Sequence, residues 1–420
     1  MLNKLTKDFY IENRKKYANL VKDNSITVIS SGTIQNSSAD EDFDFEVDKN
    51  FYYLTGINQE EVTFVLTKIN GVVKEYLFIV KNDPIKVKWL GAKLEKDEAK
   101  NLSGIENILY DDNYIEDIKK MITSEIIDIY LNLERKSGYH YEHNKVFSHK
   151  ISKAFPELVI NDCYRLIVGL RSIKTKEEVE MVKDAIEVTR IGIEKLMTES
   201  HPGMYEYQLE NYFDFVIKDN GQRLHSFKTI AAAGVNATTL HYSFNNSLLK
   251  DNDLILFDLG TETNFYISDI SRTFPINGKF TKRQREVYEE VLNVNKKCIE
   301  FLRPGLTKIE YNEYAKRLLT ESCYRLHLID KDEDINKYYF HSIGHSIGLD
   351  THDPCFFENG IEEGMLLTVE PGLYIPEEGI GIRIEDDVLI TKDGCVNLSK
   401  SIIKEVDEIE EFFKKNNKHN

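Results

Sequence analysis

The feature that most constrains this chain is a set of acidic side chains inside segments that otherwise have the apolar character of buried strands. Leu254–Phe257 is a continuous apolar run that ends in Asp258, and a second strand-like segment, Phe265–Ile270, contains Asp269. We expect two strands this close in the sequence to pair as a hairpin, which brings both carboxylates to one region. Buried carboxylates repel each other and lose hydration unless a cation lies between them. Each aspartate taken alone is also compatible with an ordinary turn residue.

Two glutamates follow the same pattern further along the chain. Side-chain alternation in the strand predicted at Leu366–Val369 places Glu370 on the face opposite two apolar side chains. In the strand predicted at Gly381–Leu389, Arg383 and Glu385 share one face and isoleucines occupy the other. A strand with one solvated face would give the same alternation. Glycine and proline next to these glutamates nevertheless permit close approach of the backbone, so both glutamates are candidate site residues.

Three of the eleven histidines lie within residues 341–353, at His341, His345 and His352. The spacing of the first two would suit a helical zinc pair, but Ser342 stands where a zinc protease of the H-E-x-x-H type needs glutamate. Two glycines in the segment also disfavour a helix. We therefore predict an extended or looped segment with His341 and His345 on one side, although a single buried histidine is usually structural.

The charges of these candidates predict a metal centre. Asp258, Asp269, Glu370 and Glu385 supply four negative charges, and His345 can supply a neutral nitrogen. Two divalent cations would balance the carboxylates and would clamp a bridging hydroxide near a substrate oxygen. Ligation dominated by oxygen with one imidazole suits Mn²⁺, with Co²⁺, Fe²⁺ or Zn²⁺ as alternatives.

Local signals divide the chain near residue 172. Residues 1–171 are predicted to form a mixed α/β domain, with a helix over Asp8–Val21 and a hairpin over Val62–Val80 around an Asn-Gly turn. From residue 172 onward we expect a sheet covered by helices, because three capping boxes precede segments with helical character. These boxes begin at Thr175, Thr281 and Thr307.

Composition excludes several classes of function. The 54 lysines and arginines against 71 aspartates and glutamates give a net charge of −17, which argues against binding to nucleic acid or an anionic membrane. The apolar runs are far shorter than the ~20 residues of a membrane-spanning helix, and we expect no signal peptide because the N-terminal segment is densely charged. Five scattered cysteines without a C-x-x-C pair predict neither a disulfide framework nor a zinc ribbon. We therefore expect a cytoplasmic protein.

At the candidate ligands the chain resembles the Xaa-Pro aminopeptidases (aminopeptidase P). This family belongs to the metallopeptidases of the pita-bread fold, which also include prolidase, methionine aminopeptidase and creatinase. The family's ligands fall in order on Asp258, Asp269, His345, Glu370 and Glu385, within the matching motifs Phe-Asp-Leu-Gly, Ser-Asp-Ile-Ser-Arg-Thr-Phe, Gly-His-Ser-Ile-Gly, Thr-Val-Glu-Pro-Gly and Gly-Ile-Arg-Ile-Glu-Asp. The resemblance implies that Asp269 and Glu385 bridge two ions, that Asp258 completes one, and that His345 and Glu370 complete the other.

The same resemblance implies roles for further residues. Glu370 would also act as general base and acid. His241 matches a catalytic histidine on the substrate side, and His352 matches a histidine that stabilises the developing oxyanion. The residues implied in substrate binding, including the proline pocket and its supporting positions, are His341, Tyr374 and Arg383.

The resemblance extends to the first half of the chain. Asn50–Gly56 is similar to a signature of the family's non-catalytic N-terminal domain. Trp89 lies in a segment similar to one whose tryptophan enters a neighbouring active site in tetrameric relatives; a plain surface or core aromatic is the alternative. The implied fold is α+β, with a creatinase-like N-terminal domain over residues 1–171 and a pita-bread catalytic domain over 172–420. The implied assembly is a homodimer or homotetramer.

The resemblance implies a metal-dependent exopeptidase that releases the N-terminal residue from peptides with proline in the second position. The main alternative is an Xaa-Pro dipeptidase (prolidase), which would use the same metals on dipeptides. Methionine aminopeptidase is disfavoured because it lacks a matching N-terminal domain. A non-catalytic peptide-binding module on the same fold would be expected to have lost metal ligands, whereas all five positions are present here.

Overall fold

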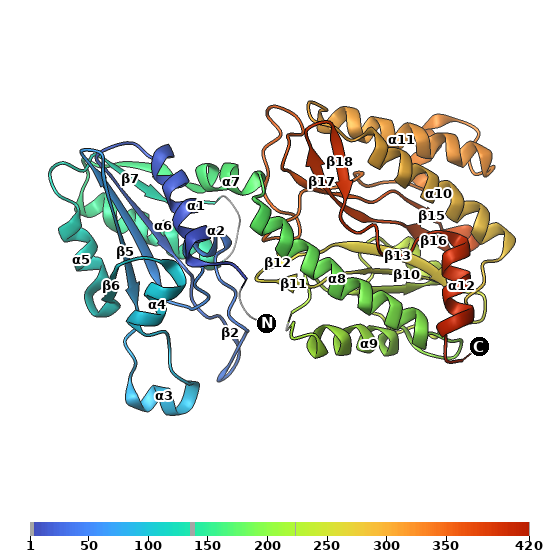
Figure 1. Cartoon of the computed structure of the whole chain (residues 1–420), viewed down its shortest axis with the longest axis horizontal. Helices are drawn as coiled ribbons and strands as arrows, with labels where there is room; N and C mark the ends of the chain where they lie inside the picture. Colours follow the sequence, from blue (N-terminus) through green and yellow to red (C-terminus); the bar gives the residue numbers. More distant parts are fainter. Residues whose placement is uncertain (1–3, 135–138, 223, 420) are drawn as a thin grey trace. The chain divides into compact units, whose positions relative to one another are not determined.

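The computed structural model describes residues 4–134, 139–222 and 224–419 (Figure 1). The chain forms two compact units and passes from the first to the second between Arg171 and Ser172. Each unit has its own sheets and its own hydrophobic core.

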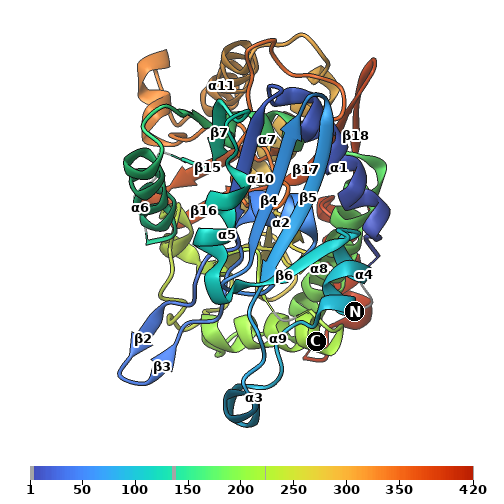
Figure 2. The same ribbon diagram turned by 90° about the vertical axis from the view of Figure 1, so that its left-hand side faces the viewer.

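The first unit is built on a six-stranded mixed sheet with the strand order β6-β5-β4-β1-β7-β8 (Figure 2). β1, β4 and β5 pair antiparallel, whereas β6, β7 and β8 join in parallel. The strands are β1 (Ser25–Ser30), β4 (Thr63–Ile69), β5 (Val72–Ile79), β6 (Asn107–Tyr110), β7 (Asp128–Leu131) and β8 (Val159–Asp162). A separate ribbon pairs β2 (Asn36–Ser38) with β3 (Glu41–Asp42).

Helices cover both faces of this sheet. On one face, Ile118 of α5 and Phe147 of α6 share a core with Val28. On the other, the Tyr17 hydroxyl of α1 lies 2.9 Å from that of Thr27, whose side chain alternates with Val28. The helices are α1 (Lys7–Leu20), α2 (Lys49–Thr55), α3 (Pro84–Leu90), α4 (Lys96–Ser103), the 3₁₀ turn η1 (Asp111–Asn113), α5 (Tyr114–Met121), α6 (Tyr139–Ala154) and α7 (Tyr164–Ser172).

The local predictions for this unit are confirmed. The opening helix is α1, and the hairpin is β4–β5. Asn70 and Gly71 in its turn have positive φ angles of 50° and 76°, as a tight hairpin requires. Trp89 lies on α3, which projects from the rest of the unit in both views (Figures 1 and 2), and it is 83% exposed. Trp89 is therefore not a core residue.

The second unit contains two antiparallel three-stranded sheets, with the orders β13-β10-β9 and β14-β17-β18. Two further antiparallel ribbons pair β11 with β12 and β15 with β16. The strands are β9 (Ile230–Ala233), β10 (Leu254–Leu259), β11 (Glu262–Thr263), β12 (Tyr266–Ile267), β13 (Ile270–Pro275), β14 (Leu366–Val369), β15 (Gly372–Ile375), β16 (Ile380–Arg383), β17 (Asp386–Thr391) and β18 (Gly394–Asn397).

Three helices of the second unit, α8, α10 and α11, begin where the capping boxes predict. Thr175, Thr281 and Thr307 each accept a hydrogen bond from the amide three residues later and form a complete box. α8 packs on α9 and against β11–β13, whereas α10 packs beside α11 and against β14–β16 (Figure 1). The helices are α8 (Lys176–Glu199), α9 (Glu206–Asp219), α10 (Lys282–Phe301), α11 (Lys308–Arg325) and α12 (Val406–Asn416), with 3₁₀ turns η2 (Gly234–Thr238), η3 (Asp332–Lys337) and η4 (Pro376–Glu378).

Among the described residues, no helix combines the length and the apolar character needed to cross a bilayer.

The single strand predicted at Phe265–Ile270 is wrong. Asn264 and Phe265 have φ angles of 51° and 66°, so the backbone reverses there and β12 is only two residues long. The partner of β10 is instead β13, which begins one residue after Asp269. The segment of Asp269 still lies beside that of Asp258, as the predicted hairpin required, but the strand that pairs with β10 begins after Asp269.

The single strand predicted at Gly381–Leu389 is also wrong. It consists of β16 and β17, with two residues between them that include Glu385. The interruption arises because β16 pairs with β15, whereas β17 pairs with β14 and β18. Asp269 and Glu385, two of the candidate ligands, therefore each lie at a point where a predicted strand is interrupted.

Candidate metal centre

A cavity of about 500 Å³ in the second unit brings together most of the predicted site residues. Its lining includes all five predicted metal ligands and four other predicted residues, which are His241, His341, His352 and Arg383. Tyr374 contacts this lining from behind, because its hydroxyl oxygen lies 2.9 Å from His341 Nε2. Residues scattered over more than 140 positions of the sequence therefore meet at one place.

The tightest cluster consists of Asp269, His345 and Glu385. One ligand atom of each lies within 4.8 Å of the other two. His345 Nε2 is 3.4 Å from Asp269 Oδ2 and 3.7 Å from Glu370 Oε1. Asp269 and Glu385 are only 4% and 2% exposed, so they are not solvated turn residues. Buried carboxylate oxygens around one imidazole nitrogen form the donor set of a divalent metal site.

Asp258 projects from β10 into the same cavity and is paired with Arg383. Arg383 Nη2 donates to Asp258 Oδ2 at 2.7 Å, and its Nε donates to Ser271 Oγ at 2.7 Å. The Ser271 hydroxyl also lies 3.1 Å from Asp258 Oδ1 and 2.7 Å from Glu385 Oε2. Ser271 therefore links two of the predicted ligands.

The ionisation of the cluster supports the fit of a cation. Burial and the charges of neighbouring carboxylates raise the pKa of Glu385 well above its usual range, and burial raises the pKa of Glu370 to about 7. Burial alone would lower the pKa of His345, but the hydrogen bond to Asp269 and its charge raise it to about 9. At neutral pH the Glu385 carboxyl group and the His345 imidazole therefore retain protons, and Glu370 is about half protonated. The residues present thus fit divalent metal, which would displace those protons.

His341 is held as a neutral imidazole. Burial and the positive charge of Arg383 lower its pKa to about 4. Its Nδ1 lies 2.8 Å from the carbonyl oxygen of Ser342, which can only accept, so Nε2 is the atom that accepts from the Tyr374 hydroxyl. Arg383 Nη1 donates in turn to the Tyr374 oxygen at 3.1 Å. This chain of hydrogen bonds fixes the orientation of the His341 ring.

His352 stacks on the ring of His345. The ring centroids lie 4.0 Å apart, with 23° between the planes. Burial and the charge of His345 lower the pKa of His352. His241 lies on the more open side of the lining, where it is exposed. The two remaining histidines of the prediction therefore border the cavity, one near the ligands and one near solvent.

Close packing of the backbone holds His345 beside Glu370. The His345 amide donates to Thr368 Oγ1 at 3.0 Å, and the Thr368 amide donates to the His345 carbonyl oxygen at 2.9 Å. A Cβ atom at Gly344 would lie 2.1 Å from the Thr368 carbonyl oxygen, so only glycine permits this approach. Residues 341–353 contain no helix, which confirms the prediction of an extended or looped segment.

Several residues of the site were not predicted from the sequence. Ser271 had a signal, because strand alternation places it on the same face as Asp269 two residues earlier. The remaining ones come from loops without a periodic pattern, and no local signal identifies them. The lining residues in this group are Phe227, Lys228, Leu240, Tyr242, Ser243 and Thr351.

Comparison with known proteins identifies the family of each part of the chain. Residues 180–392 match metallopeptidase family M24, and residues 10–130 match the N-terminal domain of aminopeptidase P. The Xaa-Pro aminopeptidase of Haemophilus influenzae is 32% identical to this chain, and the alignment covers 98% of each protein.

Two solved structures resemble the whole chain. Zn-substituted aminopeptidase P of Escherichia coli in complex with product has a TM-score of 0.92 at 29% identity, over 99% of this chain and 100% of its own. A candidate aminopeptidase P from Bacillus anthracis has a TM-score of 0.96 at 43% identity, over 99% of this chain and 100% of its own. These likenesses confirm the α+β class and the pita-bread fold of the second domain. By sequence and by structure alike, the chain belongs to metallopeptidase family M24 and carries the N-terminal domain of aminopeptidase P ahead of its peptidase domain.

Proposed function

We propose that this protein is an Xaa-Pro aminopeptidase, which releases the N-terminal residue from peptides with proline in the second position. As a member of family M24 it is a metal-dependent hydrolase whose substrates are peptides. One observation carries the finer proposal: the five proposed ligands converge in one cavity of a chain that is similar over nearly its full length to the Xaa-Pro aminopeptidases of H. influenzae and E. coli.

We assign two divalent ions to the five ligands. Asp269 and Glu385 would contact both ions, Asp258 would complete one, and His345 and Glu370 would complete the other. When bound, the ions supply Lewis acidity that polarises the substrate carbonyl group and makes water a better nucleophile. Oxygen-rich ligation favours Mn²⁺, with Co²⁺, Fe²⁺ or Zn²⁺ as alternatives. A zinc-substituted form of the E. coli relative is among the solved structures.

Glu370 is proposed as the general base and acid. Its side chain is 14% exposed, and burial brings its pKa to about 7. A carboxyl group with such a pKa can accept a proton near neutral pH and return it to a leaving group. Its two oxygens lie 3.7 Å from His341 Nδ1 and 3.7 Å from His345 Nε2, so the carboxylate is oriented between two imidazoles.

The histidines that border the cavity are proposed to act on the substrate. A neutral His352 can donate one hydrogen bond, which suits a group that stabilises charge developing on the substrate carbonyl oxygen. His241, on the exposed side, is proposed to contact the substrate before and during reaction. Neither histidine is assigned to metal.

His341, Tyr374 and Arg383 are proposed to form one wall of the proline pocket and its support. The His341 ring is uncharged and fixed in orientation, so its face can pack against a pyrrolidine ring. The proline nitrogen of the substrate carries no hydrogen, so the pocket needs no acceptor for it. A pocket of this kind would select proline by shape rather than by a hydrogen bond.

All five proposed ligands lie in residues 172–420, so we assign catalysis to this unit and a non-catalytic role to residues 1–171. Assembly as a homodimer or homotetramer, a role for Trp89 at a neighbouring site and a cytoplasmic location stay predictions. The net charge of −17 supports the proposal that neither nucleic acid nor a membrane is a partner.

Xaa-Pro dipeptidase is the second candidate, and Lys228 favours it. Lys228 lies on the cavity lining, where a cation can bind the carboxylate that a dipeptide carries next to its scissile bond. The experiment offers Xaa-Pro dipeptides and Xaa-Pro-Xaa tripeptides to the Mn²⁺-loaded protein and measures release of the N-terminal amino acid, with Glu385→Gln as the inactive control. Tripeptide turnover supports the aminopeptidase, turnover confined to dipeptides identifies the dipeptidase, and no turnover of either refutes both.

A further inference from the structure

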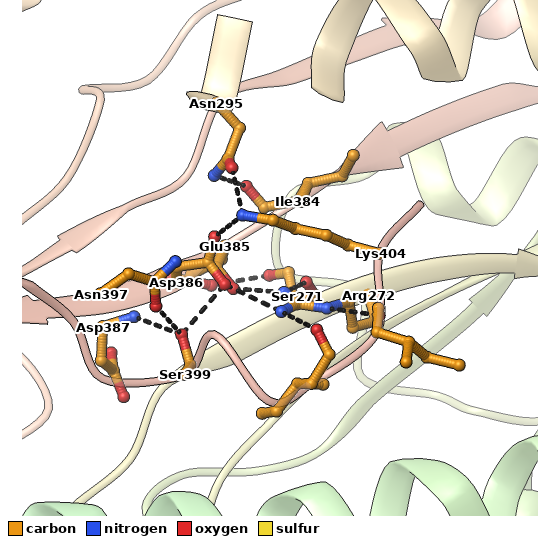
Figure 3. Close-up of polar contacts among 12 residues, drawn as sticks. Ser271, Arg272, Asn295, Ile384, Glu385, Asp386, Asp387, Asn397, Ser399 and Lys404 are labelled. Carbon is orange, nitrogen blue, oxygen red and sulfur yellow. Dashed lines mark hydrogen bonds and ion pairs between the residues drawn. The ribbon is translucent and has the colours of Figure 1, made fainter. Parts of the chain in front are cut away.

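A buried polar network adjoins the segments that carry Glu370 and Glu385, and Figure 3 shows the part of it around Glu385. It includes Asn295, which is 0% exposed on helix α10. The Asn295 amide nitrogen donates to the carbonyl oxygen of Val369 at 3.2 Å. It also donates to the carbonyl oxygen of Ile384 at 3.1 Å, as Figure 3 shows. These carbonyl groups belong to the residues directly before the two glutamates. One side chain therefore holds both ligand-bearing segments.

Donor and acceptor chemistry fixes the orientation of the Asn295 amide. The two carbonyl oxygens can only accept, so they face its NH₂ group. The Lys404 ammonium can only donate, and it lies 2.7 Å from Asn295 Oδ1. Lys404 donates to Asp386 as well. A flipped amide would lose all three hydrogen bonds, so Lys404 holds Asn295 in the orientation that binds both segments.

The network continues to a third ligand-bearing segment. Asp386 Oδ1 accepts from Arg272 Nη2 at 2.8 Å, in an ion pair whose side chains are 0% and 2% exposed. Arg272 Nη1 donates to the carbonyl oxygens of Glu385 at 2.5 Å and Ser271 at 2.9 Å. The ion pair therefore ties the backbone of Glu385 to strand β13, whose first residue follows Asp269.

Strand pairing alone does not fix the positions of the Glu370 and Glu385 backbones. The ladder of β14 and β17 ends where Val369 lies opposite Asp386. Glu370 and Glu385 are the next residues beyond that end, where the regular hydrogen bonds of the ladder stop. The Asn295 amide spans this end of the ladder by bonding one carbonyl group on each side.

We propose that Asn295 is a positioning residue that sets the separation of the Glu370 and Glu385 carboxylates and thereby the affinity for metal. The inference rests on the proposed function, in that both glutamates are taken as metal ligands. Asn295 positions the two glutamates by bonding the carbonyl groups of the residues before them, and Lys404 contributes by holding the Asn295 amide in its orientation. Removal of residues that orient metal ligands typically changes metal affinity or activity about 10- to 100-fold.

The test compares three variants of the full-length protein: Asn295→Asp, Asn295→Ala and Val287→Ala. Aspartate has the size of asparagine and keeps an acceptor for Lys404, but it places a carboxylate against two carbonyl oxygens. Val287 is buried about two turns earlier on α10, so its truncation destabilises the same helix away from those carbonyl groups. For each variant we would measure the Mn²⁺ dissociation constant of the metal-free protein, the Tm, and kcat and KM for an Xaa-Pro tripeptide.

We expect both Asn295 variants to weaken Mn²⁺ binding at least tenfold and to lower kcat with a smaller change in KM. Val287→Ala should lower the Tm and keep the wild-type affinity for Mn²⁺. Wild-type affinity in Asn295→Asp, or an equal loss of affinity in Val287→Ala, would overturn the proposal.

If the Asn295 variants do not fold, Lys404→Met gives a second comparison, because it releases the Asn295 amide, although it also removes the ammonium group that pairs with Asp386. We expect it to weaken Mn²⁺ binding in the same direction by a smaller factor, and unchanged affinity would again overturn the proposal. Failure of the proposed function has a different signature: the wild-type protein would bind Mn²⁺ and cleave no Xaa-Pro peptide. The affinity comparison would still decide the role of Asn295.

Discussion

Metal binding should release protons from this protein. Without metal, His345 has a pKa of about 9 because the hydrogen bond and charge of Asp269 outweigh the effect of burial. Glu370 has a pKa of about 7 because burial disfavours its charged form. A metal ion binds the deprotonated forms of both side chains. Binding at neutral pH must therefore displace the protons that they carry.

The number of protons follows from these two pKa values. At pH 7 the His345 imidazole is about 99% protonated and Glu370 is about half protonated, so together they release about 1.5 protons. At pH 8 the release falls to about one proton, nearly all of it from His345. This count treats Asp269 as ionised, because its charge raises the pKa of His345, and the raised pKa of Glu385 adds to the release. Below pH 9 the affinity should fall about tenfold, or about 1.4 kcal/mol, per pH unit from His345 alone.

Calorimetric titration of Mn²⁺ into the metal-free protein, in buffers with different enthalpies of ionisation, measures the proton count at a fixed pH. Glu370→Gln should release about half a proton fewer at pH 7. His201→Gln changes a histidine outside the cavity lining and should leave the count unchanged. A count near zero at pH 7, or an affinity that does not increase from pH 7 to pH 8, would refute this reasoning.

Three further substitutions test the site. Glu385→Ala should leave a folded chain that binds fewer than two Mn²⁺ ions and hydrolyses no peptide, as metal analysis and circular dichroism would check; full activity would contradict the two-ion assignment. Tyr374→Phe removes the hydrogen bond to His341, so KM for an Xaa-Pro tripeptide should rise about fivefold, from a loss of about 1 kcal/mol; an unchanged KM would exclude this role. Gly344→Ala would bring a Cβ atom to 2.1 Å from the Thr368 carbonyl oxygen. Its free energy of unfolding should fall by about 1–3 kcal/mol, with weaker Mn²⁺ binding, and wild-type thermal stability would show that the backbone can move aside.

The ends of two buried strands could be predicted from the sequence, because burial leaves a local pattern. β10 (Leu254–Leu259) contains the apolar run Leu254–Phe257 and the Asp258 that follows it, and β14 occupies the predicted range Leu366–Val369. The interruption before Glu385 could not be predicted, because the alternation of apolar and polar residues continues through it. Whether β16 and β17 form one strand or two depends on which distant strands they pair with, and no local pattern encodes that choice.

Asn295, on a helix, shows the same limit of prediction from sequence. It lies four residues after Val291 on the apolar stripe of α10, so a polar residue at a core position was visible in the sequence. Its partners were not visible. They are two carbonyl groups and the Lys404 ammonium, which lie 74, 89 and 109 residues further along the chain. A buried asparagine predicts that hydrogen-bond partners exist, but the sequence does not say which residues they are, and only the fold identifies them.

Three of the five proposed ligands have backbone amides that bond outside the ladders of the two three-stranded sheets, whereas Asp258 lies within the ladder of β10. The amides of Asp269, Glu370 and Glu385 donate to Asp387 Oδ2 at 3.1 Å, to the Ile343 carbonyl oxygen at 2.9 Å and to the Ser271 carbonyl oxygen at 3.1 Å. A regular ladder would direct successive side chains to opposite faces of a sheet. Leaving the ladder allows acids from separate strands to point into one cavity, and the hydrogen bonds that replace the ladder come from other segments of the site. The geometry of the ligands therefore depends on residues of α10 and of the segment around Lys404 as much as on the strands. A substitution there that preserves every strand can still prevent metal binding.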